Sequence, residues 1–104
     1  MIKIKLTKNS NFIKNITIKG HALYDDFGKD IVCAAVSSCV ITSVNAALLI
    51  NDSSLTYEDK KGLEINVLSN DNVTTKIIEN MINNLKELEV AYPKNIQIKE
   101  ENNE

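Results

Sequence analysis

The chain has 104 residues, of which 43% are hydrophobic and 25% are charged, which is ordinary usage for one globular domain. Its net charge is −2, and Lys supplies all twelve of its basic residues. Because there is no guanidinium group to bind phosphate or guanine in a bidentate manner, we expect no direct nucleic-acid partner.

The first two predicted elements are β-strands. Residues 2–7 alternate Ile and Leu with Lys and Thr, the period-two pattern of a strand with one buried face. The turn-forming residues 9–11 separate this run from a second alternating run, 12–20, so we expect the two to pair as a hairpin. The alternating start also lacks the continuous apolar region of a secretory signal, which predicts a cytoplasmic protein.

A long apolar helix is predicted next, from residue 30 to about residue 51. Serine, threonine and asparagine interrupt the apolar run Ile31 to Ile50, so we interpret it as a core helix and expect no membrane partner. The run is apolar nearly all round, which indicates burial against a sheet and leaves room for contact with a second subunit.

The second half of the chain repeats the order of hairpin and helix. Runs 55–58 and 63–68 predict another hairpin. Apolar residues spaced by three and four predict an amphipathic helix over 72–91, which ends before Pro93. A short strand, 96–99, follows it.

These elements predict an α+β fold with two layers. The order ββαββαβ gives a mostly antiparallel five-stranded sheet, and the two helices are expected to cover one of its faces. Residues 1–99 are expected to form a single domain, and the charged tail 100–104 is expected to be disordered.

The unusual residues gather between the second strand and the first helix. Asp30 is a suitable N-cap, which places Cys33 in the first helical turn, where unpaired backbone amides favour a thiolate. A helix terminus contributes only ~0.3 to 1 kcal/mol, so the sulfur also needs a cationic partner such as His21, the only histidine. The Asp30 carboxylate either competes with the sulfur for these amides or orients His21.

The connection from residue 22 to residue 29 is longer than most connections between a strand and a helix. It contains Tyr24 and Phe27 beside Gly28, which frees the backbone, so it is a candidate lid; the alternative is a plain surface loop. One turn beyond Cys33, Ser37 lies on the same helical face and is interpreted as a supporting residue.

The cysteines predict neither a disulfide nor a metal site. Cys33 and Cys39 are six residues apart in one helix, where an axial rise of about 9 Å exceeds the ~7 Å limit for a disulfide. With one histidine and no CxxC motif, zinc would lack ligands, so we expect no metal and no cofactor. Cys39 is expected to lie in the core.

Two segments resemble the ribosomal-processing cysteine proteases, the Prp family. They are Gly-His-Ala at 20–22 and Asp-Ile-Val-Cys-Ala-Ala-Val-Ser at 30–37, and the resemblance extends up to the charged tail. It implies a homodimeric cysteine-protease domain that removes the N-terminal extension of a ribosomal large-subunit protein.

The resemblance also implies roles for individual residues. Cys33 would be the nucleophile, His21 the general base and acid, and Asp30 a supporting residue. Gly20 and Gly28 would be hinges. The acidic and aromatic loop departs from the family pattern.

In the expected mechanism, His21 takes the proton of Cys33, the sulfur attacks a peptide carbonyl, and amides of the first helical turn stabilise the oxyanion. The alternative is a non-catalytic adaptor that binds a peptide or a ribosomal protein and whose cysteine only senses oxidation. A thiol-redox role is disfavoured because a resolving cysteine is not within reach. Cleavage assays with variants of Cys33 and His21 distinguish an enzyme from an adaptor.

Overall fold

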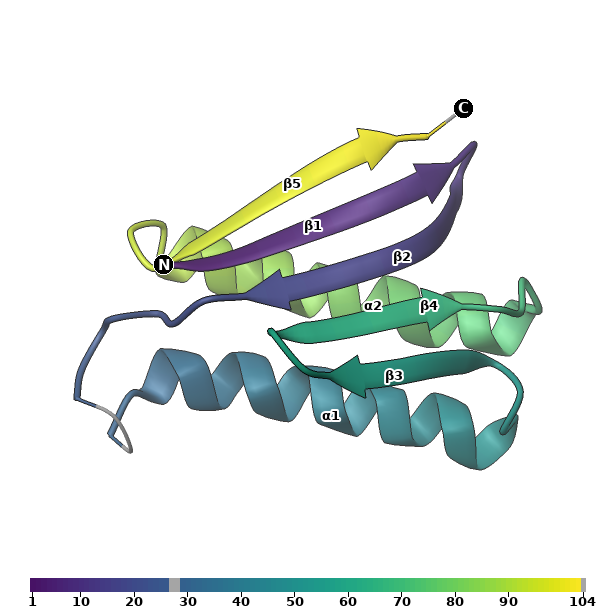
Figure 1. Ribbon diagram of the computed structural model, residues 1–104, viewed down its shortest axis with the longest axis horizontal. Helices are drawn as coiled ribbons and strands as arrows, with labels where there is room; N and C mark the ends of the chain where they lie inside the picture. Colours follow the sequence, from purple (N-terminus) through teal and green to yellow (C-terminus); the bar gives the residue numbers. More distant parts are fainter. Residues whose placement is uncertain (27–28, 104) are drawn as a thin grey trace.

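The computed structural model describes residues 1–26 and 29–103, in which two helices cover one face of a five-stranded sheet (Figure 1). In chain order the elements are β1 (Ile2–Asn9), β2 (Phe12–Lys19), α1 (Ile31–Ile50), β3 (Leu55–Asp59), β4 (Leu63–Val67), α2 (Asn72–Ala91) and β5 (Ile96–Asn102). The predicted ββαββαβ order and the two-layer α+β fold are confirmed.

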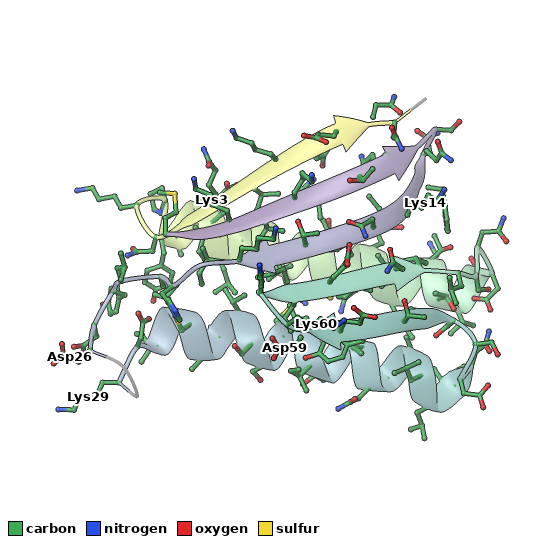
Figure 2. The ribbon with its side chains drawn as sticks, viewed as in Figure 1. Lys3, Lys14, Asp26, Lys29, Asp59 and Lys60 are labelled. Atoms are coloured by element: carbon green, nitrogen blue, oxygen red, sulfur yellow. The ribbon has the colours of Figure 1, made fainter. Side chains whose placement is uncertain are left out.

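The sheet has the strand order β3-β4-β2-β1-β5. The pairs β1/β2, β2/β4 and β3/β4 are antiparallel, whereas β1 and β5 are parallel, so the sheet is mostly antiparallel, as predicted. Alternation decides its two faces: Ile2, Ile4 and Leu6 of β1 are buried under the helices. Charged side chains such as Lys3 stand on the opposite, solvent-facing side (Figure 2).

Helix α1 carries a row of valines spaced four residues apart. This spacing places them on one face of the helix, and that face packs against the core. The row consists of Val32, Val36, Val40 and Val44, each at most 3% exposed. By length and composition α1 is the one helix of the described chain that could cross a membrane, a test that core helices also pass. Its valine row packs into the core, in agreement with its interpretation as a core helix.

Helix α2 begins at the cap Asp71, whose carboxylate accepts a hydrogen bond from the amide of Thr74 at 2.7 Å. It ends at Ala91, and its C-cap Tyr92 directly precedes Pro93, as the sequence predicts. The connection that follows returns the chain to the sheet: the amide of Ile2 donates to the carbonyl of Asn95 at 2.8 Å. The start of β5 therefore lies beside the start of β1.

The last strand is longer than predicted. β5 continues to Asn102, so the expectation of a disordered tail is wrong for residues 100–102. Glu100 pairs in register with Leu6, and its carboxylate forms ion pairs with Lys8 at 3.2 Å and Lys86 at 3.0 Å. Hydrogen bonds from these two lysines lower the pKa of the Glu100 carboxyl. The charge of Glu100, one of those that suggested disorder, is therefore paired with lysines of β1 and α2.

Candidate active site

Cys33 lies in the first turn of α1, as predicted, because Asp30 caps this helix. The Oδ1 atom of Asp30 accepts hydrogen bonds from the amides of Val32 and Cys33, both at 3.0 Å. The cysteine is half-buried and packs against the core. Its thiol is free and lies at the end of the helix nearest the motif that contains His21.

A hydrogen bond joins the two sequence motifs. The amide of Ala22 donates to the Sγ atom of Cys33 at 3.2 Å. Ala22 is 1% exposed and directly follows His21, which is exposed. His21 and Cys33 also line the same pocket, of about 840 Å³. The structure therefore brings the histidine and the cysteine to one site, and the described contact between their segments runs through the Ala22 amide.

The other walls of this pocket come from the ends of the two hairpins, from the connection before α1 and from the first turns of α1. The lining residues include Ile2, Ile18, Gly20, Leu23, Asp25, Asp30, Ser37, Asp59, Lys61, Gly62 and Leu63. Figure 2 shows Asp59 and Lys60 at the turn between β3 and β4. The β3–β4 turn thus forms one wall of the pocket, and the pocket has both charged and apolar walls.

The chain reaches the sulfur through two unusual backbone conformations. Gly20 has a φ of +91°, and a Cβ atom there would overlap the carbonyl oxygen of Met1. Leu23 has a φ of +58°, in the left-handed region that residues with a Cβ atom seldom adopt. Ala22 lies between these two bends. The glycine of the first motif is therefore required by geometry, and its predicted role as a hinge stays a prediction.

Asp30 also fastens the connection between β2 and α1. Its Oδ2 atom accepts hydrogen bonds from the amides of Tyr24 at 3.0 Å and Asp25 at 3.4 Å. Partial desolvation raises the pKa of the Asp30 carboxyl, but hydrogen bonds from the amides of Cys33, Tyr24, Asp25 and Val32 outweigh it, so the pKa lies below its usual value. All four described hydrogen bonds of this carboxylate go to backbone amides, which supports the cap interpretation.

Three amides at the start of α1 are therefore engaged. Val32 and Cys33 donate to the Asp30 side chain, and Ala34 donates to the Asp30 carbonyl at 3.1 Å. The competition of Asp30 for the Val32 and Cys33 amides, one of the two alternatives that the sequence left open, is therefore observed, whereas stabilisation of an oxyanion by amides of this turn stays a prediction. The donor that reaches the sulfur is the Ala22 amide instead, which sequence reasoning missed.

The remaining predicted site residues are placed as follows. Ser37 is exposed and lines the pocket, and the Tyr24 ring packs edge-on against Tyr92 with 5.5 Å between centroids. Phe27 and Gly28, predicted as lid and hinge, lie outside the described residues. Asp26, which the structure describes, lies at the outer part of the connection, away from the sheet (Figure 2).

Cys39 is half-buried, and its thiol donates to the carbonyl of Met81 at 3.7 Å. Burial raises the pKa of the Cys39 thiol. This thiol packs against the core, as predicted, and lies outside the pocket. In the described parts of the chain, 1–26 and 29–103, His, Cys, Asp and Glu form no group of three or more that could hold a metal ion.

Comparisons with known proteins give one family. The sequence model described as cysteine protease Prp matches residues 1–97. The ribosomal processing cysteine protease Prp of Staphylococcus aureus is 30% identical over 103 residues, which span 94% of this chain and 97% of that protein. A ribosomal processing cysteine protease Prp of Mycoplasma genitalium is 46% identical over 44 residues, which span 42% of this chain and 39% of that protein.

Solved structures share the fold. The S. aureus processing protease Prp, crystallised with a covalently linked product peptide, superposes with a TM-score of 0.90 at 25% identity, covering 97% of this chain and 100% of that one. The crystal structure of a Streptococcus mutans protein gives a TM-score of 0.87 at 22% identity, covering 99% of this chain and 96% of that one. The second likeness shows the fold alone.

Proposed function

Because the chain belongs to the family of the cysteine protease Prp and is itself a cysteine protease, we propose that Cys33 is its nucleophile and His21 its general base and acid. The observation that carries this assignment is the 3.2 Å hydrogen bond from the Ala22 amide to the Cys33 sulfur. It joins the residue next to the histidine to the only described thiol that lines the pocket.

The reaction proceeds in two halves. The His21 imidazole accepts the proton of the Cys33 thiol, and the sulfur attacks the carbonyl carbon of the scissile peptide bond. The imidazolium then returns the proton to the leaving amine as the carbon–nitrogen bond breaks. Water, activated by the same imidazole, hydrolyses the thioester and restores the thiol. Each half requires only the side chains of the pocket and water.

The Ala22 amide supports the charged form of the nucleophile. A backbone N–H that is already aimed at the sulfur stabilises negative charge there without reorganisation during the reaction. The amides of Val32 and Cys33 donate to Asp30, so the connection rather than the helix terminus supplies this donor. Asp30 supports the site by capping α1 and by accepting hydrogen bonds from the connection between β2 and α1.

The substrate is the precursor of a ribosomal large-subunit protein, from which the enzyme removes the N-terminal extension. The S. aureus relative is described as a ribosomal processing protease, and its crystal structure holds a covalently linked product peptide. A pocket of about 840 Å³ at the surface has room for several side chains of an extended peptide. Ile18 and Leu63 give it an apolar wall, and Asp59 and Lys61 a polar one.

The proposal extends to a homodimer in the cytoplasm. The side of α1 that faces away from the core carries exposed apolar residues: Ile31, Ile41 and Leu49 are 39% to 88% exposed. A second subunit that covers this side would remove these side chains from water.

The test is cleavage of a peptide that spans the extension and the start of the mature ribosomal protein, followed by mass spectrometry. Cys33→Ala and His21→Ala are expected to lower the cleavage rate by at least about a hundredfold, because each removes a group that acts in the chemical step. Cys39→Ala is the matched control, since it removes the second thiol outside the pocket.

Two outcomes would overturn the proposal. The first is a peptide that stays whole in the presence of the unmodified protein although it binds, which would indicate an adaptor. The second is a loss of cleavage in Cys39→Ala as large as the loss in Cys33→Ala.

A further inference from the structure

Asn95 reaches the candidate active site from a distant part of the chain. It lies in the connection between α2 and β5, and its Nδ2 atom donates to the carbonyl oxygen of Ala22 at 2.8 Å, across 73 positions of sequence. The amide of Ala22 in turn donates to the Cys33 sulfur at 3.2 Å. The two peptide groups that flank the Ala22 Cα atom therefore link the Asn95 side chain to the nucleophile.

Asn95 is itself held in place by its backbone. Its amide donates to the carbonyl of Tyr92 at 3.0 Å, and its carbonyl accepts from the amide of Ile2 at 2.8 Å. The side chain is half-buried. Since both backbone groups are bonded to the end of α2 and the start of β1, the side-chain amide projects from a fixed support.

The geometry at Ala22 needs such a support. The carbonyl of Ala22 belongs to the same peptide group as the amide of Leu23, whose φ of +58° is unfavourable for a residue with a Cβ atom. The Leu23 side chain is 77% exposed, so its burial does not compensate for this conformation. A hydrogen bond to the Ala22 carbonyl fixes the orientation of this peptide group directly.

A second contact ties the same two segments together. The ring of Tyr92 meets the ring of Tyr24 edge-on, with 5.5 Å between centroids. The connection after α2 thus touches the connection before α1 on both sides of Leu23. Ala22, which lies between these contacts and the sulfur, is 1% exposed and has little room to move.

From these contacts we infer that Asn95 is a positioning residue for the nucleophile: it fixes the Ala22 peptide groups so that the Ala22 amide points at the Cys33 sulfur. The inference rests on the proposed role of Cys33. It predicts an effect on the reactivity of the sulfur and on kcat, and no effect on KM, because Asn95 does not line the pocket where the peptide binds.

The test compares three variants. Asn95→Ala removes the side-chain donor, and Asn95→Asp keeps its size but places a carboxylate oxygen against the Ala22 carbonyl. The matched control is Asn15→Ala: Asn15 is also half-buried, and its Nδ2 atom also makes a 2.8 Å hydrogen bond, to Asn66 between neighbouring strands away from the pocket.

Two readouts follow the sulfur and the reaction separately. One is the rate at which iodoacetamide alkylates Cys33 at neutral pH, located by fragmentation mass spectrometry with Cys39 as the internal reference. The other is kcat and KM for the precursor peptide. Both Asn95 variants are expected to show about tenfold slower alkylation and about tenfold lower kcat at unchanged KM, the size expected for one hydrogen bond. Asn15→Ala is expected to match the parent protein in both.

The inference is overturned if Cys33 of Asn95→Asp is alkylated at the parent rate, if only KM changes, or if Asn15→Ala loses as much reactivity. Circular dichroism and melting temperatures show which variants fold, and the nearly isosteric Asp variant decides the question if the Ala variant does not. The alkylation readout needs no peptide. A parent protein that fails to cleave the precursor therefore contradicts the proposed function, while slow alkylation in the Asn95 variants still supports the positioning role.

Discussion

Replacing Gly20 by alanine tests whether the bend before His21 controls the reactive sulfur. Gly20 has a φ of +91°, and the new Cβ atom would overlap the Met1 carbonyl oxygen, which belongs to backbone and cannot swing away. The left-handed conformation alone costs a residue with a Cβ atom ~1–2 kcal/mol, and relief of the overlap raises the total to about 2–3 kcal/mol. For a domain of this size, that corresponds to a melting temperature lower by about 10–20 °C.

The relaxation expected in Gly20→Ala moves the end of β2 away from the start of β1 and carries Ala22 with it. Gly62→Ala is the control for lost stability, because Gly62 has a φ of +117° and its Cβ atom would lie 2.7 Å from the carbonyl oxygen of Ile18. Since Gly62 also lines the pocket, the two variants are compared by alkylation of Cys33 and not by cleavage of a peptide. Both variants are expected to lose similar stability in thermal unfolding. Alkylation of Cys33 by iodoacetamide, measured well below both melting temperatures, is expected to slow about tenfold in Gly20→Ala alone, since that variant loses the hydrogen bond from Ala22.

The reasoning is refuted if the two glycine variants slow the alkylation of Cys33 equally, because the effect would then follow general destabilisation. It is also refuted if Gly20→Ala melts at the temperature of the parent protein. In that case the overlap with the Met1 carbonyl is relieved without loss of stability, and steric overlap does not explain why a glycine occupies this position.

Two further predictions concern charge. Asp30→Asn is expected to lower the melting temperature at pH 7 because its amide nitrogen cannot accept from Tyr24 and Asp25. The pKa of the Asp30 carboxyl is lowered in the folded protein, so its stabilisation is present above the usual value of 3.8 and is lost as the pH falls further. The difference between parent and variant should therefore shrink below pH 3.8; a constant difference from pH 7 to pH 2.5 would contradict this. Deleting residues 100–104 is expected to cost about 1–2 kcal/mol in urea unfolding, since it removes strand hydrogen bonds and half-exposed ion pairs of Glu100 with Lys8 and Lys86. Unchanged stability would instead support the disordered tail expected from the sequence.

The sequence predicted the elements that have one dominant periodicity. The alternation in β1 identified its buried face, and the three- and four-residue spacing of apolar side chains identified α2, because each pattern is local and repeats several times. The first helix was identified by a long run of residues that is apolar nearly all round. The end of β5 was missed, since Glu100 and Glu101 do not alternate with apolar residues. Their place in the sheet depends on pairing with β1 and on ion pairs with Lys5, Lys8 and Lys86, which the sequence alone does not bring close.

The site was predictable where chemistry lies in short motifs. Asp30 and Cys33 are three residues apart, so a helix cap places the cysteine in the first turn without any tertiary information. Asn95 and Ala22 were missed because their hydrogen bond spans 73 positions and depends on how β5 returns beside β1. A lone asparagine after a helix has many uses, and nothing in its local sequence indicates this one.

The position of Asp30 shows why the connection matters more to the sulfur than the helix terminus does. One oxygen of this carboxylate accepts hydrogen bonds from the amides of Val32 and Cys33, so these two amides donate to Asp30 and not to the sulfur. A carboxylate this close also repels a thiolate. Its second oxygen favours the thiolate indirectly. It accepts hydrogen bonds from the amides of Tyr24 and Asp25, which keeps the connection in the position where the Ala22 amide donates to the Cys33 sulfur. Asp30 and Asn95 thus hold the same segment from its two sides, and a nucleophile supported in this way should respond to changes in either support.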